Sequence, residues 1–377
     1  MSFEKNNSKP PQSRKKVVLI SPVFQDKSKY TFKGLTNGGG GRYVSELALS
    51  ISQYLDTTLV TFGESDYEFK HEGLQIRIIK CKPFLRKFNG DGDFLCLRLI
   101  SILKDFDIIH SFQYYTETTL FSCLVSKIFK KKLFITDLGF RGINISRYIP
   151  MKYFCTKLLL LSDYEAKLYR MRQGSYEVIG GGVNLKKYHY GRHKKNKVIF
   201  IGRLLPHKGV NYLIQSLDNN TECIISGFKQ DFRYFELLKS LANGKKVKFL
   251  LSASDKEIAK HLRESAALVL PSVDVDIYGK SHKNTELFGL VIAEAFACGT
   301  PVIVSNSSAL PYVVDDGING FVVNQNDPVS ISKKIMILVQ NIEKSTAMGL
   351  SAYNKAVSRY NWEYVAQRCV ANYTNNI

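Results

Sequence analysis

Short aliphatic and β-branched runs alternate with segments of helical periodicity along most of the sequence. The runs Val198–Gly202 and Leu268–Pro271 are apolar throughout, which favours parallel strands covered on both faces. In Arg42–Leu55, apolar residues recur at three- and four-residue steps, as on one face of a helix. This alternation predicts β/α units built on parallel sheets.

The alternation occurs twice, first from Val17 and again from Lys197. At roughly 100–200 residues per domain, 377 residues suit two domains. We therefore expect an α/β fold of two doubly wound, Rossmann-like domains facing a cleft. The expected divisions are a disordered basic arm (1–16), a first domain (17–185), a linker (186–197), a second domain (198–358) and a terminal helical segment (359–377).

Composition excludes several classes of protein. The longest apolar stretch, Val291–Val304, is interrupted by Glu294 and falls short of the ~20 residues that a bilayer span needs. Val17–Phe24 contains Ser21 and Pro22, so it is expected to be a first strand and not the core of a signal peptide. The seven scattered cysteines lack zinc spacing, which predicts a reduced, cytoplasmic compartment and no structural zinc.

The net charge of +20 is concentrated in the first half, since residues 1–197 hold 34 Lys and Arg against 17 Asp and Glu. Nucleic acid, an anionic membrane surface or an anionic small substrate could each be the partner, and a basic surface kept for solubility is the alternative. Met151–Leu161 and Tyr164–Met171 are amphipathic and basic. A wider basic stretch surrounds Tyr148, Ile149, Met151 and Leu158–Leu161, and this mixture suits an anionic membrane surface. Its basic residues are Arg141, Arg147, Lys152, Lys157, Lys167, Arg170 and Arg172. A solvated helix face would give the same pattern.

Two motifs suit phosphate groups. Gly38–Gly41 precedes the helix expected at Arg42, where glycines allow close approach and helix N–H groups are unpaired; a flexible surface loop is the alternative. Arg203 and Lys208 flank a short turn directly after the strand 198–202. At the carboxyl end of a strand, these two cations would suit a diphosphate, although a solvated pair is also possible.

The strongest motif extends from Glu286 to Pro301. Glu286 precedes a helix whose first turn contains Gly289, and Glu294 lies within that helix among apolar residues. A carboxylate in such surroundings needs a partner, and sugar or ribose hydroxyls are suitable ones. A capping Glu286 and a salt-bridged Glu294 would be the purely structural interpretation.

Together these elements resemble the retaining, nucleotide-sugar-dependent glycosyltransferases of the GT-B fold, known as group 1 or family 4. The likeness rests on the E-x7-E spacing of Glu286 and Glu294 and on G-R-x-x-x-x-K-G at 202–209. Gly299-Thr300-Pro301 and the Asp316–Gly320 segment follow in the family's order. The resemblance is dense over 198–373 and thinner over 17–185.

The resemblance implies a role for each motif. Arg203 and Lys208 would neutralise the donor diphosphate, Glu286 would contact the donor sugar, and Glu294 would hold the ribose. The family is metal-independent, so neither a metal nor another cofactor is expected, and the last helix would cross back to the first domain. Donor contacts are also implied for Gly202, for the N–H groups around Phe288, Gly289 and Leu290, and for Gly39, Gly40 and Gly41 of the opposite domain.

The acceptor side departs from the family pattern. Many members have a histidine where this chain has Asp137, and His110 resembles a strand-end position near the acceptor cleft. The expected acceptor is a glycan, on a lipid-linked or membrane-associated carrier, with the enzyme cytoplasmic or peripheral on the inner face of the membrane. A catalytically inactive scaffold of the same fold, a basic nucleic-acid-binding protein and a nucleotide-sugar epimerase or phosphorylase are the competing interpretations.

Overall fold

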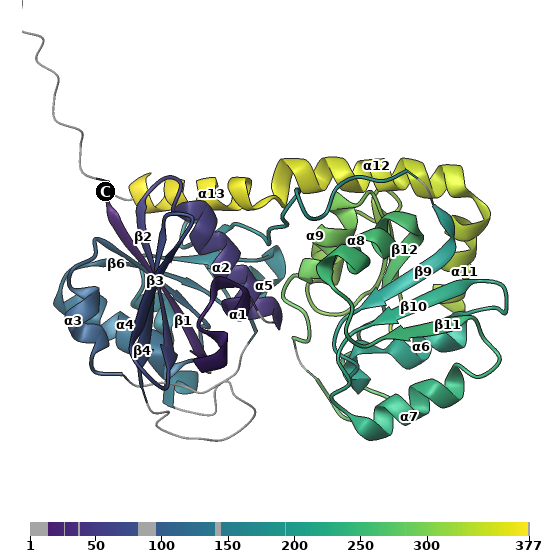
Figure 1. Ribbon diagram of the computed structural model, residues 1–377, viewed down its shortest axis with the longest axis horizontal. Coiled ribbons are helices and arrows are strands. Elements are labelled where there is room, and N and C mark those ends of the chain that lie inside the picture. Colours follow the sequence, from purple (N-terminus) through teal and green to yellow (C-terminus); the bar gives the residue numbers. More distant parts are fainter. Residues whose placement is uncertain are drawn as a thin grey trace, which may run out of the picture. The chain divides into compact units, whose positions relative to one another are not determined.

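A computed structural model describes residues 14–25, 27–36, 38–81, 96–139, 145–192, 194–282 and 284–375. Most of the arm expected at 1–16 therefore lies outside the described residues. The chain divides into two compact units (Figure 1). The first comprises Met1–Thr136, Arg141–Lys157 and Val370–Ile377, and the second comprises Asp137–Phe140 and Leu158–Cys369.

The first sheet has eight strands in the order β3-β4-β2-β1-β5-β6-β7-β8. Strand β3 runs antiparallel to β4, whereas β1 is parallel to both β2 and β5. Val17–Ile20 of β1 are fully buried, as expected for a central strand covered on both faces. The strands are β1 (Lys16–Gln25), β2 (Asp56–Gly63), β3 (Tyr67–His71), β4 (Leu74–Lys80), β5 (Ile108–Phe112), β6 (Lys132–Thr136), β7 (Lys157–Leu160) and β8 (Tyr176–Val178).

The second sheet has six parallel strands in the order β11-β10-β9-β12-β13-β14. After β9, the strands β10 and β11 extend the sheet on one side. The later strands β12, β13 and β14 extend it on the other side of β9. The boundary between β9 and β12 is therefore the switch point at which such sheets bind ligands. The strands are β9 (Lys195–Ile201), β10 (Glu222–Ser226), β11 (Val247–Leu250), β12 (Ser265–Leu270), β13 (Val302–Ser305) and β14 (Gly320–Val323).

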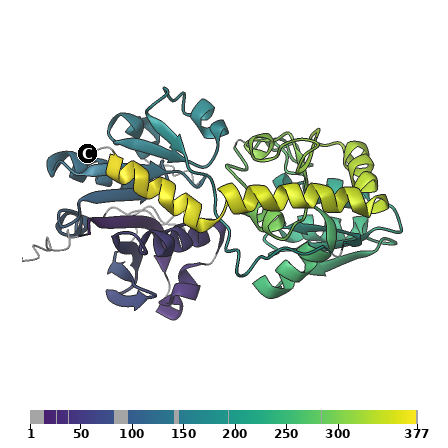
Figure 2. The ribbon, with the colours of Figure 1, turned by 90° about the horizontal axis from the view of Figure 1, so that it is seen from above.

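Helices cover both faces of the second sheet (Figure 1). Helices α6 and α11 pack on one face, whereas α8, α9 and α12 pack on the other. Figure 2 shows α12 and α13 as successive yellow helices with a break between them. The longer helices are α2 (Gly38–Ile51), α4 (Glu117–Ile128), α5 (Asp163–Leu168), α6 (Val210–Ser216), α7 (Phe232–Leu241), α8 (Asp255–Glu264), α9 (Leu290–Ala297), α11 (Pro328–Gln340), α12 (Ile342–Arg359) and α13 (Trp362–Asn375); the shorter ones are α1 (Phe32–Leu35), α3 (Leu99–Leu103) and α10 (Leu310–Val313).

The glycine run is not a loop in front of a helix. Helix α2 begins at Gly38, so Gly38–Gly41 form its first turn. A side chain at position 41 would clash with the backbone oxygen of Leu35, which explains a glycine there. Glycine has poor helix propensity, and for this reason the sequence suggested a loop.

The basic segment that follows also differs from expectation. Residues 151–153 form a short 3-10 turn, η3 (Met151–Tyr153), and β7 comes four residues later. Leu158–Leu161 are buried, so they cannot belong to a surface patch. An aliphatic run of four residues fits a buried strand and a helix equally well, and here sheet pairing with β8 decided the outcome.

Candidate functional site

The loops that follow β9 and β12 meet at the switch point of the second sheet. The turn η4 (Pro206–Lys208) follows β9, and the carbonyl of His207 accepts a hydrogen bond from the Val273 amide at 2.9 Å. Gly209 closes this turn with φ of 66°, and a Cβ there would overlap the carbonyl oxygen of Pro271. Only glycine permits both this backbone conformation and this approach, so the two loops hold a fixed geometry.

Two predicted site residues, Lys208 and Glu286, form an ion pair in this position. Nζ of Lys208 donates to Oε1 of Glu286, and the Ser272 hydroxyl donates to the same oxygen at 3.3 Å. Lys208 is only 9% exposed, so the pairing offsets the cost of removing its charge from water. An ammonium group has three donors, which leaves Lys208 with donors for an anion as well.

Arg203 is exposed at the start of the same turn. Burial, together with the nearby charges of Lys208 and Arg203, lowers the pKa of His207 to about 3. These groups are therefore close together, and His207 is neutral at pH 7. The surroundings of the turn favour negative charge, as a diphosphate would require.

A second histidine joins this cluster through a hairpin after β12. His282 lies over His207 with ring centroids 4.8 Å apart, and its Nε2 is 2.6 Å from Oδ2 of Asp276. Burial acts to raise the pKa of Asp276, but hydrogen bonds from His282 and from the Lys280 and Tyr278 amides outweigh it, and the pKa is lowered. Nothing in the sequence indicated that His207 and His282 contact each other or Asp276. Only the position of His207 within the Arg203–Lys208 turn could have placed it near the site.

Helix α9 supplies the second acidic residue and a helix start. Glu294 is buried in α9 at 7% exposure, and Gly289 caps the helix with φ of 82°. The first N–H groups of a helix have no partner inside it and carry partial positive charge. Phe288 is buried against the ring of Tyr360, with centroids 5.0 Å apart, so its side chain belongs to the core and only its backbone remains a candidate for ligand contact.

Asp137 lies in a buried acidic cluster of the second unit. The Tyr169 hydroxyl donates to its Oδ2, and the Gly139 amide donates to Oδ1 at 3.2 Å. Glu165, which completes the capping box at the start of α5, is fully buried. Burial raises the pKa of Glu165 well above its usual range, and the nearby charge of Asp137 raises it further. The sequence pointed to Asp137 but not to Glu165 or Tyr169.

This cluster contacts the residue that follows Glu286. The hydroxyl of Ser162 donates to the carbonyl of Leu287 at 2.8 Å. A Cβ at Gly139 would lie 3.5 Å from the Leu287 side chain, which is ordinary van der Waals distance. The 137–139 segment and the start of α5 therefore pack directly against the backbone that carries Glu286.

His110, the other acceptor-side candidate, is fully buried in the first unit. Its Nδ1 is 2.6 Å from the Tyr373 hydroxyl, and its Nε2 is 2.9 Å from the Thr136 hydroxyl. Burial lowers its pKa to about 3. Both ring nitrogens are occupied and no face reaches the surface, so His110 links β5, β6 and α13 and does not face an acceptor.

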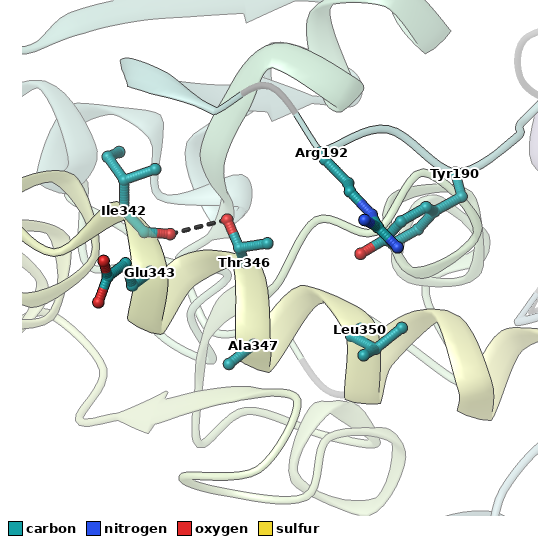
Figure 3. Close-up of a pocket in the computed structure, with 7 residues that line it drawn as sticks. All are labelled: Tyr190, Arg192, Ile342, Glu343, Thr346, Ala347 and Leu350. Carbon is teal, nitrogen blue, oxygen red and sulfur yellow. Dashed lines mark hydrogen bonds between the residues drawn. The ribbon is translucent and has the colours of Figure 1, made fainter.

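The remaining candidates lie elsewhere. Gly39, Gly40 and Gly41 belong to the first unit, and their contact with phosphate stays a prediction. Within the described ranges, no three His, Cys, Asp or Glu side chains gather as metal ligands would, and independence of metals likewise stays a prediction. A hollow of about 400 Å³ between the linker and α12 contains none of the predicted site residues (Figure 3). Its lining is Tyr190, Arg192, Ile342, Glu343, Thr346, Ala347 and Leu350.

Comparison with known sequences identifies the second unit. Residues 185–355 match the family described as Glycosyl transferases group 1. An uncharacterized glycosyltransferase of Methanocaldococcus jannaschii is 28% identical over 306 residues, which cover 76% of this chain and 81% of that protein. A phosphatidyl-myo-inositol mannosyltransferase of Mycobacterium leprae is 30% identical over 188 residues, which cover 47% of this chain and 46% of that protein.

Solved structures share the architecture of both units. HepE of Anabaena, determined in complex with UDP, superposes with a TM-score of 0.72 at 16% identity and covers 96% of this chain and 100% of its own. Sucrose-phosphate synthase of Thermosynechococcus elongatus gives 0.71 at 17% identity, over 96% of this chain and 99% of its own. These likenesses confirm the predicted fold class, an α/β fold with two Rossmann-like domains as in GT-B proteins. Residues 185–355 therefore match the group 1 glycosyltransferases in sequence, and the described chain shares the fold of solved glycosyltransferases.

Proposed function

We propose that this glycosyltransferase moves a hexose from a UDP- or GDP-linked donor to an acceptor hydroxyl, with retention of anomeric configuration. The buried Lys208–Glu286 pair at the switch point of the second sheet carries the proposal. It places one cation and one carboxylate side by side where such sheets bind nucleotides. The related fold of HepE, which was solved with UDP, supports a nucleotide at this place.

In this mechanism fixed charges lower the barrier. As the bond between sugar and diphosphate breaks, negative charge grows on the leaving group, and Lys208 and Arg203 stabilise it. The N–H groups at the start of α9 add positive potential, while Glu286 contacts the sugar and Glu294 accepts ribose hydroxyls. Charged and polar groups that are oriented before the reaction contribute most to such a step. The tight packing of the loops after β9 and β12 keeps these groups oriented.

A panel of UDP- and GDP-sugars tests the donor. A ligand that binds only the folded chain at 100 times its Kd stabilises it by about 2.7 kcal/mol, so the correct donor should raise the Tm by several degrees. The same donor should then release nucleoside diphosphate when an acceptor is supplied. A Tm unchanged by every donor would contradict the proposal, and binding without turnover under all acceptor conditions would indicate an inactive scaffold.

We further propose that the acceptor is carried on a lipid at an anionic membrane surface, where the enzyme binds peripherally. Among the described residues no helix is long and apolar enough to cross a bilayer, so the contact would be superficial. Ile128 at the end of α4 is 72% exposed, and Tyr148 and Tyr153 are 81% and 71% exposed. Between Glu117 and Asp163 the sequence has eight Lys and Arg and a single acidic residue, the buried Asp137.

Two parts of this region lie close together. Cys155, directly after η3, is close enough to Lys127 of α4 for that charge to lower its pKa, although burial raises the pKa overall to about 12. The end of α4, with the exposed Lys127 and Ile128, is therefore a neighbour of the turn with Tyr153, and the proposed patch comprises both. Exposed aromatic and aliphatic side chains among lysines are typical of surfaces that enter the headgroup layer.

Vesicle sedimentation tests this surface. The chain should bind vesicles that contain phosphatidylglycerol and not vesicles of phosphatidylcholine alone, and added salt should weaken the binding. Ile128→Glu combined with Tyr153→Glu should lower the bound fraction about tenfold or more. Phe232→Glu, at an exposed site on α7, is the control and should leave binding unchanged. Equal binding of the double variant would instead indicate a merely solvated face.

A further inference from the structure

Glu165 has one carboxylate oxygen that its capping role does not explain. Its Oε2 accepts the Leu161 amide at 2.5 Å and the Ser162 amide at 3.3 Å, as in a capping box. Its Oε1 is buried and has no hydrogen-bond partner among the described residues. A buried carboxylate oxygen without a donor is costly, and protonation removes that cost by turning the oxygen into a donor.

Asp137 is the group that could accept a hydrogen bond from a protonated Glu165. Tyr169, the C-cap residue of α5, follows Glu165 by four residues, so the two residues lie on the same side of the helix. The Tyr169 hydroxyl donates to Asp137, which places the Asp137 carboxylate beside that side of the helix. Two carboxylates in one buried site cannot both be ionised without large repulsion.

We propose that Glu165 and Asp137 share one proton, carried on Oε1 of Glu165, and that this hydrogen bond positions the 137–139 segment against Leu287. Asp137 then stays ionised and accepts the Tyr169 hydroxyl, the Gly139 amide and the Glu165 hydroxyl. Glu165 is a positioning residue: it acts through the Leu287 backbone on the adjacent Glu286 and touches no substrate. The effect on turnover rests on the proposed donor site, whereas the shared proton does not.

The charges around Glu165 make this pair responsive to pH. Asp137 lies in the segment after β6, and Tyr169 is the C-cap residue of α5; Asp163 and Lys167, on α5, are exposed to solvent. The pKa of Glu165 is raised in the folded chain, so its contribution to stability is fully present below the unfolded pKa of about 4.5. That contribution is lost as pH rises through the folded pKa, when the second negative charge forms beside Asp137.

Glu165→Gln separates the shared proton from simple capping. Glutamine accepts the Leu161 and Ser162 amides with its oxygen and donates to Asp137 with its NH2 group, but it does not titrate. In the wild type, Tm and kcat should fall as pH rises through the Glu165 pKa, with kcat falling about tenfold per pH unit beyond it. In Glu165→Gln both should stay level over the same range. Asp163→Asn, an exposed acid on the same helix, is the control and should keep the wild-type profile.

Two outcomes would overturn the inference. If Tm of Glu165→Gln falls with pH in parallel with the wild type, the proton is not shared at this site. If Glu165→Gln loses activity at every pH as Glu165→Ala does, glutamine does not reproduce the bond and the residue acts otherwise. The Tm profile needs no substrate, so it tests the shared proton even if no donor is turned over. If the wild-type Tm falls with pH but the wild-type kcat does not, only the proposed effect of Glu165 on Glu286 is rejected.

Discussion

Lys208→Ala is expected to lower kcat/KM for the nucleotide-sugar about 10²–10³-fold, the usual cost of removing one preoriented electrostatic group from an active site. Lys208 is the buried cation of the switch point, and its proposed role is to stabilise charge on the departing diphosphate. The loss should appear mainly in kcat, because that charge is greatest in the transition state. Release of nucleoside diphosphate under saturating donor measures it.

The same substitution leaves Glu286 without its partner, which requires a separate control. Breaking a buried ion pair costs about 3–5 kcal/mol of unfolding free energy. Both side chains of this pair are partly exposed, so we expect a cost of about 3 kcal/mol or less. The double variant Lys208→Ala, Glu286→Gln should recover much of the stability but none of the turnover. Lys239→Ala, at an exposed ion pair on α7, should change neither. Unchanged turnover in Lys208→Ala would refute the donor site.

The unfolding free energy is expected to rise with pH between about 7 and 10.5 because of Lys194. Its Nζ donates to the Thr300 hydroxyl at 2.9 Å and to the Arg263 carbonyl at 3.1 Å, and neither partner is acidic. Burial lowers its pKa from 10.5 to about 7. Across that window the unfolded chain binds a proton that the folded chain does not, so stability increases with pH, by about 1.4 kcal/mol per pKa unit and at most ~4–5 kcal/mol.

Urea unfolding at pH 7 and pH 9.5 measures this slope. Lys194→Met keeps the aliphatic stem without the titrating group, so the slope should flatten. The Thr300 hydroxyl retains a partner in the variant because it also donates to the Leu262 carbonyl at 2.6 Å. Lys195→Met, an exposed lysine at the next position, is the matched control and should keep the wild-type slope. Parallel slopes in all three proteins would show that Lys194 stays protonated.

The residues that gather at the proposed donor site were predictable because they lie in short local motifs. Arg203 and Lys208 flank one turn after a strand, and Glu286 leads into one helix, so strand-end geometry was enough to bring them together. The alternation of apolar runs with helical periodicity likewise predicted two parallel sheets. Hydrophobic periodicity is set by neighbours along the chain, and therefore it survives in the sequence alone.

Tertiary structure decided which side chains meet across long separations. Packing buried His110 against Tyr373, 263 residues away, although its place at a strand end suggested an acceptor site. It also paired Asp137 with Tyr169 and brought both beside Glu165, and it folded Gly38–Gly41 into a helical turn. Residue spacing carries no information about such contacts, because the free energy of burying and pairing a polar group depends on neighbours that only the folded chain supplies.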